Sequence, residues 1–186
     1  MISIQIQTIR DHLIATAKEV DHWFDKDAAL RAFPPSDGGW TIDQVLEHIS
    51  LTSHFLLILI DKGVKKAKNK VAAQNLEEAL ENYTFHQEKL EQIGQHQSFE
   101  WIRPIHMEPK GNQPLDTVRA TIQSQFQRCI QHLDDLPNGE GTLHRTRMTV
   151  NQLGKIDMYE YIYFLSKHAE RHLQQMAKIE SEYQAG

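Results

Sequence analysis

The sequence has only one cysteine, Cys129, among its 186 residues. No disulfide can form within the chain, which fits a reducing compartment, and we expect a cytoplasmic protein. The N-terminal segment MISIQIQTIRDHL lacks a basic region, an apolar core and a small-residue cleavage site. It therefore lacks the features of a signal peptide.

Long apolar runs and an excess of positive charge are also missing. The longest apolar run, FLLILI from Phe55 to Ile60, is far short of the roughly 20 residues that span a bilayer, so we expect a soluble protein with no membrane contact. The formal charge of −5 and the pI near 6.1 argue against nucleic-acid binding, which uses concentrated positive charge. The one basic cluster, from Lys62 to Lys70, is typical of a solvated helix end and linker.

Strand alternation and internal repeats are absent, whereas apolar residues recur at steps of three and four, the period of an α-helix. Five helices are predicted, over about residues 3–30, 41–61, 76–93, 115–133 and from 157 onward. The length suits one core, so the sequence predicts a single all-α domain over residues 1–186. Four long helices would form its bundle, with the weaker helix at 76–93 added to it.

Prolines, glycines and capping residues mark where these helices begin and end. FPPSDGGW, residues 33–40, stops the first helix, because two prolines and two glycines cannot continue it. Thr41 and Gln44 have capping-box spacing, as do Asp157 and Glu160 at the start of the last helix. Gly63 is available for the C-terminal turn of the second helix. Residues 98–114 hold three prolines and a glycine and predict an ordered loop over one end of the protein.

Two histidines, His168 and His172, fall on the apolar stripe of the last predicted helix. Their spacing places both imidazoles on one face, one turn apart. A buried polar group left unpaired costs about 1–3 kcal/mol, so the pair needs a shared partner. A divalent metal suits this role because neutral imidazole is its commonest protein ligand. The alternative is that both rings bond to neighbouring groups, or lie in a solvent-filled groove, without a metal.

The second predicted helix offers two candidates for a third ligand. His48 shares a helical face with Thr52. His54 lies instead on the face that carries Glu47. Periodicity does not choose between the two histidines.

Three motifs in order resemble the DinB-like superfamily. Trp40 stands eight residues before His48, a leucine–glycine turn ends at Gly154, and the last helix carries H-x2-R-H-x2-Q from His168 to Gln175. This superfamily includes the damage-inducible DinB proteins and the YfiT-like metal-dependent hydrolases and bacillithiol transferases. The resemblance covers most of the chain, but residues 65–114 match no motif.

The resemblance implies a four-helix bundle of up-down-down-up or related topology, with an extra short helix and long loops. It implies a metal, zinc or nickel first among the candidates, held by His48, His168 and His172. Three such ligands leave a fourth position for water or substrate. The implied function is a metal-dependent enzyme acting on a small molecule, either a hydrolase or a transferase with a low-molecular-weight thiol as co-substrate. The alternative is a non-catalytic metal-binding or stress-induced helical scaffold.

Further expectations concern the surroundings of the site and the partners of the chain. No general base is evident. Glu47 is expected at the outer surface or against a neighbouring chain, and Arg171 at the surface, which is favoured, or in contact with an anion. Gln175 is expected either to contact the site or to lie at the end of the bundle. Cys129 lies in an apolar stripe and is expected in the core rather than as a nucleophile. The family resemblance also implies that a homodimer can form through an exposed helical face. A groove leading to the metal position, lined by residues from the two proline-containing loops, would favour an enzyme, and a site sealed by side chains would favour a scaffold.

Overall fold

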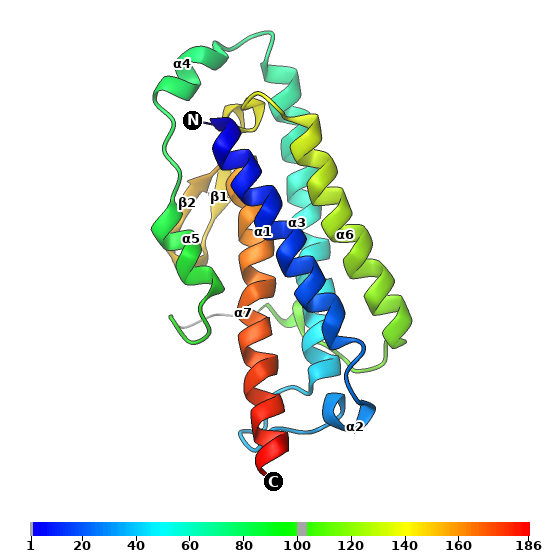
Figure 1. The fold of residues 1–186 in the computed structure, drawn as a ribbon. Helices are drawn as coiled ribbons and strands as arrows, with labels where there is room; N and C mark the ends of the chain where they lie inside the picture. The colour runs from blue at the N-terminus through cyan, green and yellow to red at the C-terminus, as the bar shows by residue number, and fades with distance from the viewer. Residues whose placement is uncertain (1, 100–103) are drawn as a thin grey trace.

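The computed structural model describes residues 2–99 and 104–186, and four long helices dominate it (Figure 1). They are α1 (Ile2–Trp23), α3 (Ile42–Lys70), α6 (Leu115–Asp135) and α7 (Met158–Ala185). Helices α1 and α7 run in one direction and α3 and α6 in the other, as the colours in Figure 1 show. Each of α1 and α3 packs against both α6 and α7. The predicted all-α bundle of up-down-down-up topology is therefore confirmed.

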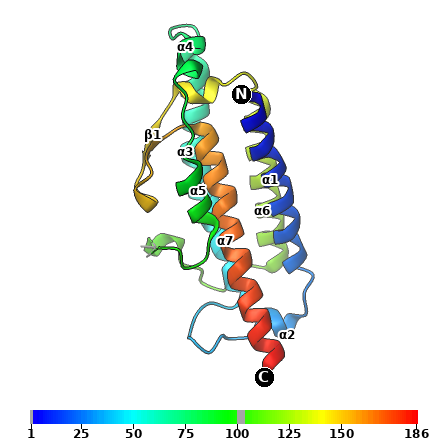
Figure 2. The same cartoon turned by 60° about the vertical axis from the view of Figure 1, so that its left-hand side comes forward.

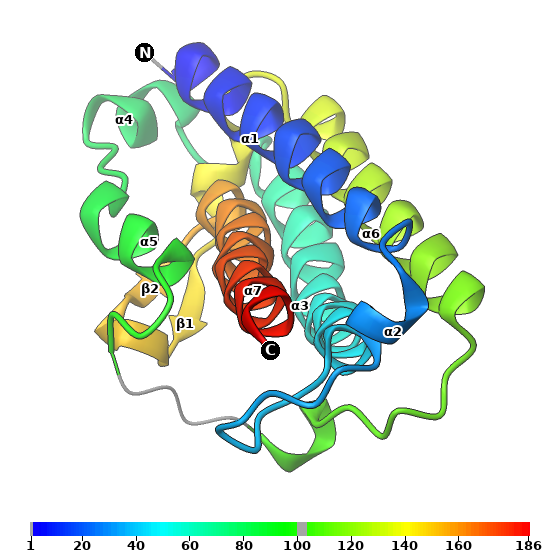
Figure 3. The ribbon, with the colours of Figure 1, turned by 60° about the horizontal axis from the view of Figure 1, so that its bottom comes forward.

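Shorter elements connect and cover the bundle helices. They are α2 (Ala28–Arg31), α4 (Leu76–Glu81), α5 (Gln87–Gly94), the 3-10 turns Ile105–Met107, Glu140–Leu143 and Val150–Gln152, and the strands β1 (Thr146–Met148) and β2 (Gly154–Ile156). Helix α5 runs alongside α7, and the two strands pair antiparallel (Figure 2). Figure 3 shows α7 between the other bundle helices on one side and α5 with the strands on the other. The sequence did not predict the strands, because three residues are too few to display alternation.

Several predicted boundaries differ from the observed ones. The first helix ends at Trp23, and Asp27 caps the separate short helix α2. The helix predicted over residues 76–93 is broken between α4 and α5, where His86 and Gln87 interrupt its apolar stripe. The capping box of Thr41 and Gln44 is confirmed by both of its hydrogen bonds, at 3.3 and 3.0 Å. Within the described residues, none of the helices has both the length and the apolar character needed to cross a bilayer.

Helix α7 is buried on every side along its first twelve residues, Met158 to Ala169. Its polar groups therefore find partners on the covering segments. Glu160 accepts hydrogen bonds from the backbone and the ring of His86 at 2.8 and 2.6 Å. Lys167 pairs with Glu91 of α5 at 2.6 Å. These pairs hold α5 and the residues before it against the face of α7 that carries polar residues.

Gly63 does not end its helix, which continues for seven residues to Lys70. It lies where α3 meets the start of α7, and a methyl group added there would overlap the sulfur of Met158. The side chain of Met158 is fully buried, so the sulfur has little room to move. Gly63 is thus explained by the close approach of two helices rather than by a helix terminus.

We predict that Gly63→Ala lowers the free energy of unfolding by about 1–3 kcal/mol, the usual cost of overpacking a core. The same change made in a Met158→Ala background should cost much less, because the space is then vacant and alanine favours a helix over glycine by about 1 kcal/mol. Urea unfolding of the native protein, the two single variants and the double variant gives the coupling energy between the two positions. Equal costs in both backgrounds would contradict the packing explanation.

Candidate metal centre

Three histidines from two neighbouring helices meet inside the bundle. His48 comes from α3, and His168 and His172 come from adjacent turns of α7. One nitrogen from each ring lies within 4.8 Å of the other two, and all three residues are buried. The structure thus places His48 beside the pair on α7. His54, the other candidate, is exposed on a different face of α3.

Hydrogen bonds on the outer side of two rings determine which nitrogen faces the cluster. His48 Nδ1 donates to the carbonyl oxygen of Met107 at 2.7 Å. His172 Nδ1 donates to Gln175 Oε1 at 2.8 Å, so Gln175 does contact the site. A neutral imidazole that donates through Nδ1 presents Nε2 as an acceptor. Such outer partners are the usual way in which proteins orient histidine ligands toward a metal.

The spacing of the nitrogens fits a metal ion. His172 Nε2 and His168 Nε2 are 3.2 Å apart. Two nitrogens bound to one tetrahedral zinc at 2.0–2.1 Å would be about 3.3 Å apart. The described residues therefore supply three imidazoles in an arrangement that could hold one ion.

Burial keeps the two histidines of α7 in the form that binds metals. Desolvation, together with the neighbouring His172 and His48, lowers the pKa of His168 well below its ordinary value. Desolvation also lowers the pKa of His172 to about 3, with smaller contributions from His48 and Arg171. Both rings are consequently neutral at pH 7, and neutral imidazole is the ligand form.

The cluster is not sealed, because it lines a cavity of about 290 Å³. The other lining residues are Gly38, Gly39, Trp40, His96, Arg171 and Gln175. The indole of Trp40 lies 4.7 Å, centroid to centroid, from the ring of His48 and forms one wall. Gly38 to Trp40 belong to the turn that separates the first two predicted helices, so that turn positions the mouth of the site.

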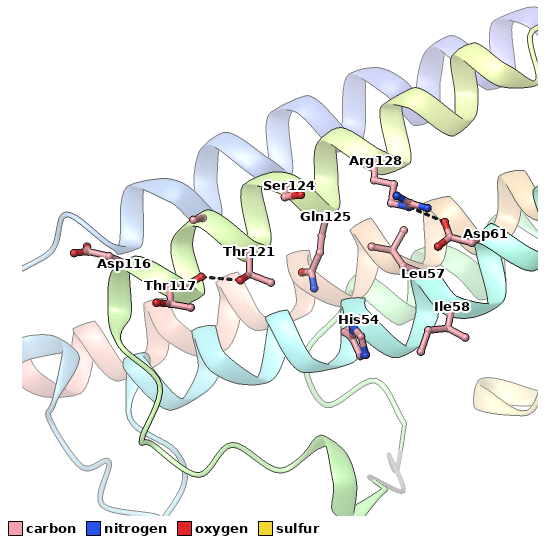
Figure 4. Close-up of a pocket in the computed structure, with 11 residues that line it drawn as sticks. His54, Leu57, Ile58, Asp61, Asp116, Thr117, Thr121, Ser124, Gln125 and Arg128 are labelled. Carbon is pink, nitrogen blue, oxygen red and sulfur yellow. Dashed lines mark hydrogen bonds and ion pairs between the residues drawn. The ribbon is translucent and has the colours of Figure 1, made fainter.

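A larger cavity of about 730 Å³ lies elsewhere, in an open groove between α3 and α6 (Figure 4). His54, Ile58 and Asp61 of α3 face residues of α6 across it, and Asp61 pairs with Arg128 at 2.8 Å. This groove does not contain the three-histidine cluster. Its size alone therefore does not make it the chemical site.

The surface position expected for Glu47 and Arg171 was wrong. Glu47 is buried, and its carboxylate accepts hydrogen bonds from the backbone N–H groups of Lys110 and Gly111 at 3.2 and 2.7 Å. Arg171 is only 8% exposed and lines the cavity, because α5 and the segment after it cover the polar side of α7. Apolar periodicity could not show this, since the covering segment belongs to the part of the chain without a motif.

The remaining candidates lie outside the cluster or within the core. His106 is exposed, and its ring packs against Phe55 at 4.5 Å between centroids. Cys129 is fully buried, and burial raises the pKa of its thiol to about 12, so the predicted core position is confirmed. Of the loop predicted over residues 98–114, residues 100–103 lie outside the described part of the chain. His96 also lines the cavity, although no pattern in the sequence indicated it.

Comparison with known proteins identifies one family. The sequence model of the DinB superfamily matches residues 5–176, which is most of the chain and includes all three histidines. No curated protein and no solved structure gives a significant match.

We predict that the metal-free protein loses stability as the pH falls below about 6.5. The folded pKa values of His168 and His172 lie below the unfolded value, so the unfolded chain binds more protons, and the loss continues toward pH 3. In this range each histidine lowers the free energy of unfolding by about 1.4 kcal/mol for each pH unit of acidification. Urea unfolding between pH 7 and pH 4 should show a shallower slope for His172→Gln. His54→Gln, at an exposed position, should retain the native slope, and equal slopes in all three proteins would refute the prediction.

We also predict that Glu47 positions His48 through the loop that carries Met107. Glu47→Gln weakens the charge-assisted bonds to the backbone of Lys110 and Gly111, so the carbonyl that orients His48 is held less firmly. Zinc affinity, measured by competition with a chelating dye, should fall by about tenfold, the low end for loss of an outer partner. Glu77→Gln, at an exposed carboxylate on α4, should leave the affinity unchanged. Unchanged affinity in Glu47→Gln would exclude this positioning role.

Proposed function

The chain belongs to the DinB superfamily, and on that basis we propose that it is a divalent-metal-dependent enzyme acting on small molecules. One observation carries the proposal: His48, His168 and His172 converge at the wall of an open cavity. Three imidazole ligands leave one position of a tetrahedral ion for water or substrate, which is the arrangement of catalytic rather than structural zinc. Zinc or nickel is the expected ion, since imidazole suits both.

A divalent ion in this position would supply a Lewis acid able to activate water or a thiol. Groups of the protein then account for binding and orientation. The backbone carbonyl of Met107 and the side chain of Gln175 hold the rings of His48 and His172 in place, and Trp40 encloses one side of the cavity. The reaction classes we propose are hydrolysis and the transfer of a low-molecular-weight thiol to an electrophile. Both need an open metal position beside a cavity of this kind.

The size of the cavity supports a small-molecule substrate. Its volume of 290 Å³ is about ten times the volume that one water molecule occupies in the liquid. A molecule of that size can be enclosed, whereas a folded partner or a duplex cannot. A metal-binding scaffold without turnover is the second candidate, but it gives no reason for the metal position to face a cavity.

The proposal predicts about one transition metal per chain in protein purified without an affinity tag. His48→Ala and His168→Ala should each lose it, because two imidazoles hold an ion far less tightly than three. His54→Ala is the matched control, since it removes a histidine from the same helix but outside the cluster, and it should retain the metal. Elemental mass spectrometry measures the content directly.

Turnover is then tested with the metal-loaded protein. Chromogenic electrophiles supplied with small thiols test the transferase, and chromogenic esters and amides test the hydrolase, with His48→Ala as the inactive reference. Metal retained in the His48→Ala and His168→Ala variants, or none bound after reconstitution with zinc or nickel, would reject the metal site. A bound metal without turnover in either assay would support the scaffold.

A further inference from the structure

Two carboxylates, those of Asp157 and Glu160, are buried together at the start of α7. Both residues are fully buried, and they form the capping box of this helix. Asp157 Oδ1 accepts the backbone N–H of Glu160 at 3.0 Å, and Glu160 Oε2 accepts the backbone N–H of Asp157 at 2.9 Å. Burial penalises each negative charge, and two such charges within one helical turn repel each other. The pair is therefore easier to bury with one proton than with none.

The hydrogen bonds of the pair indicate which carboxylate takes the proton. Glu160 accepts three N–H groups, because its Oε1 also binds the backbone and the ring of His86 at 2.8 and 2.6 Å. Asp157 Oδ2, in contrast, is buried without a hydrogen bond among the described residues. A carboxylate that accepts several N–H bonds is held in its ionised form, whereas burial without such bonds favours the protonated form. Glu160 thus keeps its charge, and Asp157 is the site of proton binding.

The groups around the pair do not remove its excess of negative charge. The titratable and charged ones are Glu160 and Tyr159 of α7, Tyr83 and His86 from the residues between α4 and α5, and Arg145 before β1. Arg145 is exposed and affects Asp157 less than burial and Glu160 do. Burial, and after it the charge of Asp157, raises the pKa of the Tyr83 phenol, which stays neutral. Burial, and next the charge of Glu160, raises the pKa of Asp157 to about 7.

The α4–α5 connection, residues 82–86, is the part of the fold that can open beside this pair. None of its residues is buried, and α4 before it contributes no buried residue either. The side chain of His86 is 34% exposed, although its ring binds the fully buried Glu160. The pair itself belongs to the buried start of α7, which cannot move without disturbing the core. Water therefore reaches the two carboxylates most easily when the connection moves away and its two bonds to Glu160 break.

We propose that Asp157 and Glu160 control the α4–α5 connection through one proton: with the proton bound the connection is closed over α7, and loss of the proton opens it. The closed form retains a proton that the open, hydrated form releases near the ordinary pKa of an aspartate. Rising pH therefore favours the open form, until Asp157 is ionised in both. Because α5 follows the connection and ends two residues before His96 of the cavity wall, this control acts on the layer beside the metal centre. The inference does not depend on the proposed reaction.

Titration of the His86 ring would give a pH dependence of the same sign, because loss of its charge weakens its bond to Glu160. Two substitutions separate the two causes. Asp157→Asn cannot ionise, yet asparagine caps a helix about as well as aspartate does. His86→Gln removes the titrating ring but keeps the backbone N–H that Glu160 accepts. The proposal predicts that only Asp157→Asn abolishes the pH dependence.

The test measures hydrogen exchange of the backbone amide at position 86 in the full chain, corrected for the intrinsic pH dependence of exchange. This amide donates directly to Glu160, so its protection reports the closed connection. In the native protein the protection should fall about tenfold between pH 6 and pH 8. The fall should be about the same in His86→Gln and absent in Asp157→Asn. Local exchange is used because global unfolding includes the opposite pH effect of the metal-centre histidines.

A matched control and a direct titration complete the test. Asp27→Asn removes a charge from another helix cap, that of α2, at an exposed position, and it should keep the native fall. The amide of Ile122, in the core of α6, should show no fall in any folded variant. Constant protection in the native protein, or a fall that survives in Asp157→Asn, overturns the inference. If that variant does not fold, the carboxyl carbon of Asp157 is followed by NMR in the native chain, and a midpoint at the ordinary value of an aspartate overturns it.

Discussion

The burial of the first twelve residues of α7 on every side is the constraint on which the rest of the structure depends. A central helix that carries Glu160 and Lys167 must give each of them a partner, because an unpaired buried charge is far too costly. The partners come from the covering layer, His86 for Glu160 and Glu91 for Lys167. The polar requirements of one helix therefore act together with the buried Leu90 and Ile93 to hold α5, a helix of only eight residues, in position.

The same constraint shapes the candidate metal centre. With α5 held against α7, the segment that follows it lies over the turn carrying Arg171 and brings His96 to the cavity. On the other side, the carboxylate of Glu47 holds the loop whose Met107 carbonyl orients His48. The three histidines are thus presented by two helices, while much of the wall around them comes from loops attached by a few polar contacts. The loop residues of the cavity wall can therefore vary while the three histidines keep their positions.

Local patterns in the sequence predicted what depends on local structure. Apolar steps of three and four predicted the bundle helices, and the capping spacing at Thr41 and at Asp157 predicted two helix starts that both have complete capping boxes. The structure also brings together the histidines expected from the family resemblance, where periodicity had left His48 and His54 equal. The predictions for Gly63 and Arg171 were wrong, because the surroundings of these residues depend on residues distant in sequence. These are Met158 for the glycine and Gln95 for the arginine. The spacing of apolar residues along a single helix cannot reveal such contacts.

The geometry of the histidines also allows a comparison of two ways to satisfy their ring nitrogens, a metal ion or hydrogen bonds alone. A proton on His168 Nε2 could bridge to His172 Nε2 across their 3.2 Å separation and satisfy that pair without an ion. It cannot serve the third ring, because a proton joins two nitrogens and not three. His48 Nδ1 donates to the Met107 carbonyl, and its Nε2 meets the Thr52 hydroxyl at 3.4 Å, a long contact. A tetrahedral ion, in contrast, binds one nitrogen from each of three imidazoles, so the cluster could hold one ion through all three rings at once.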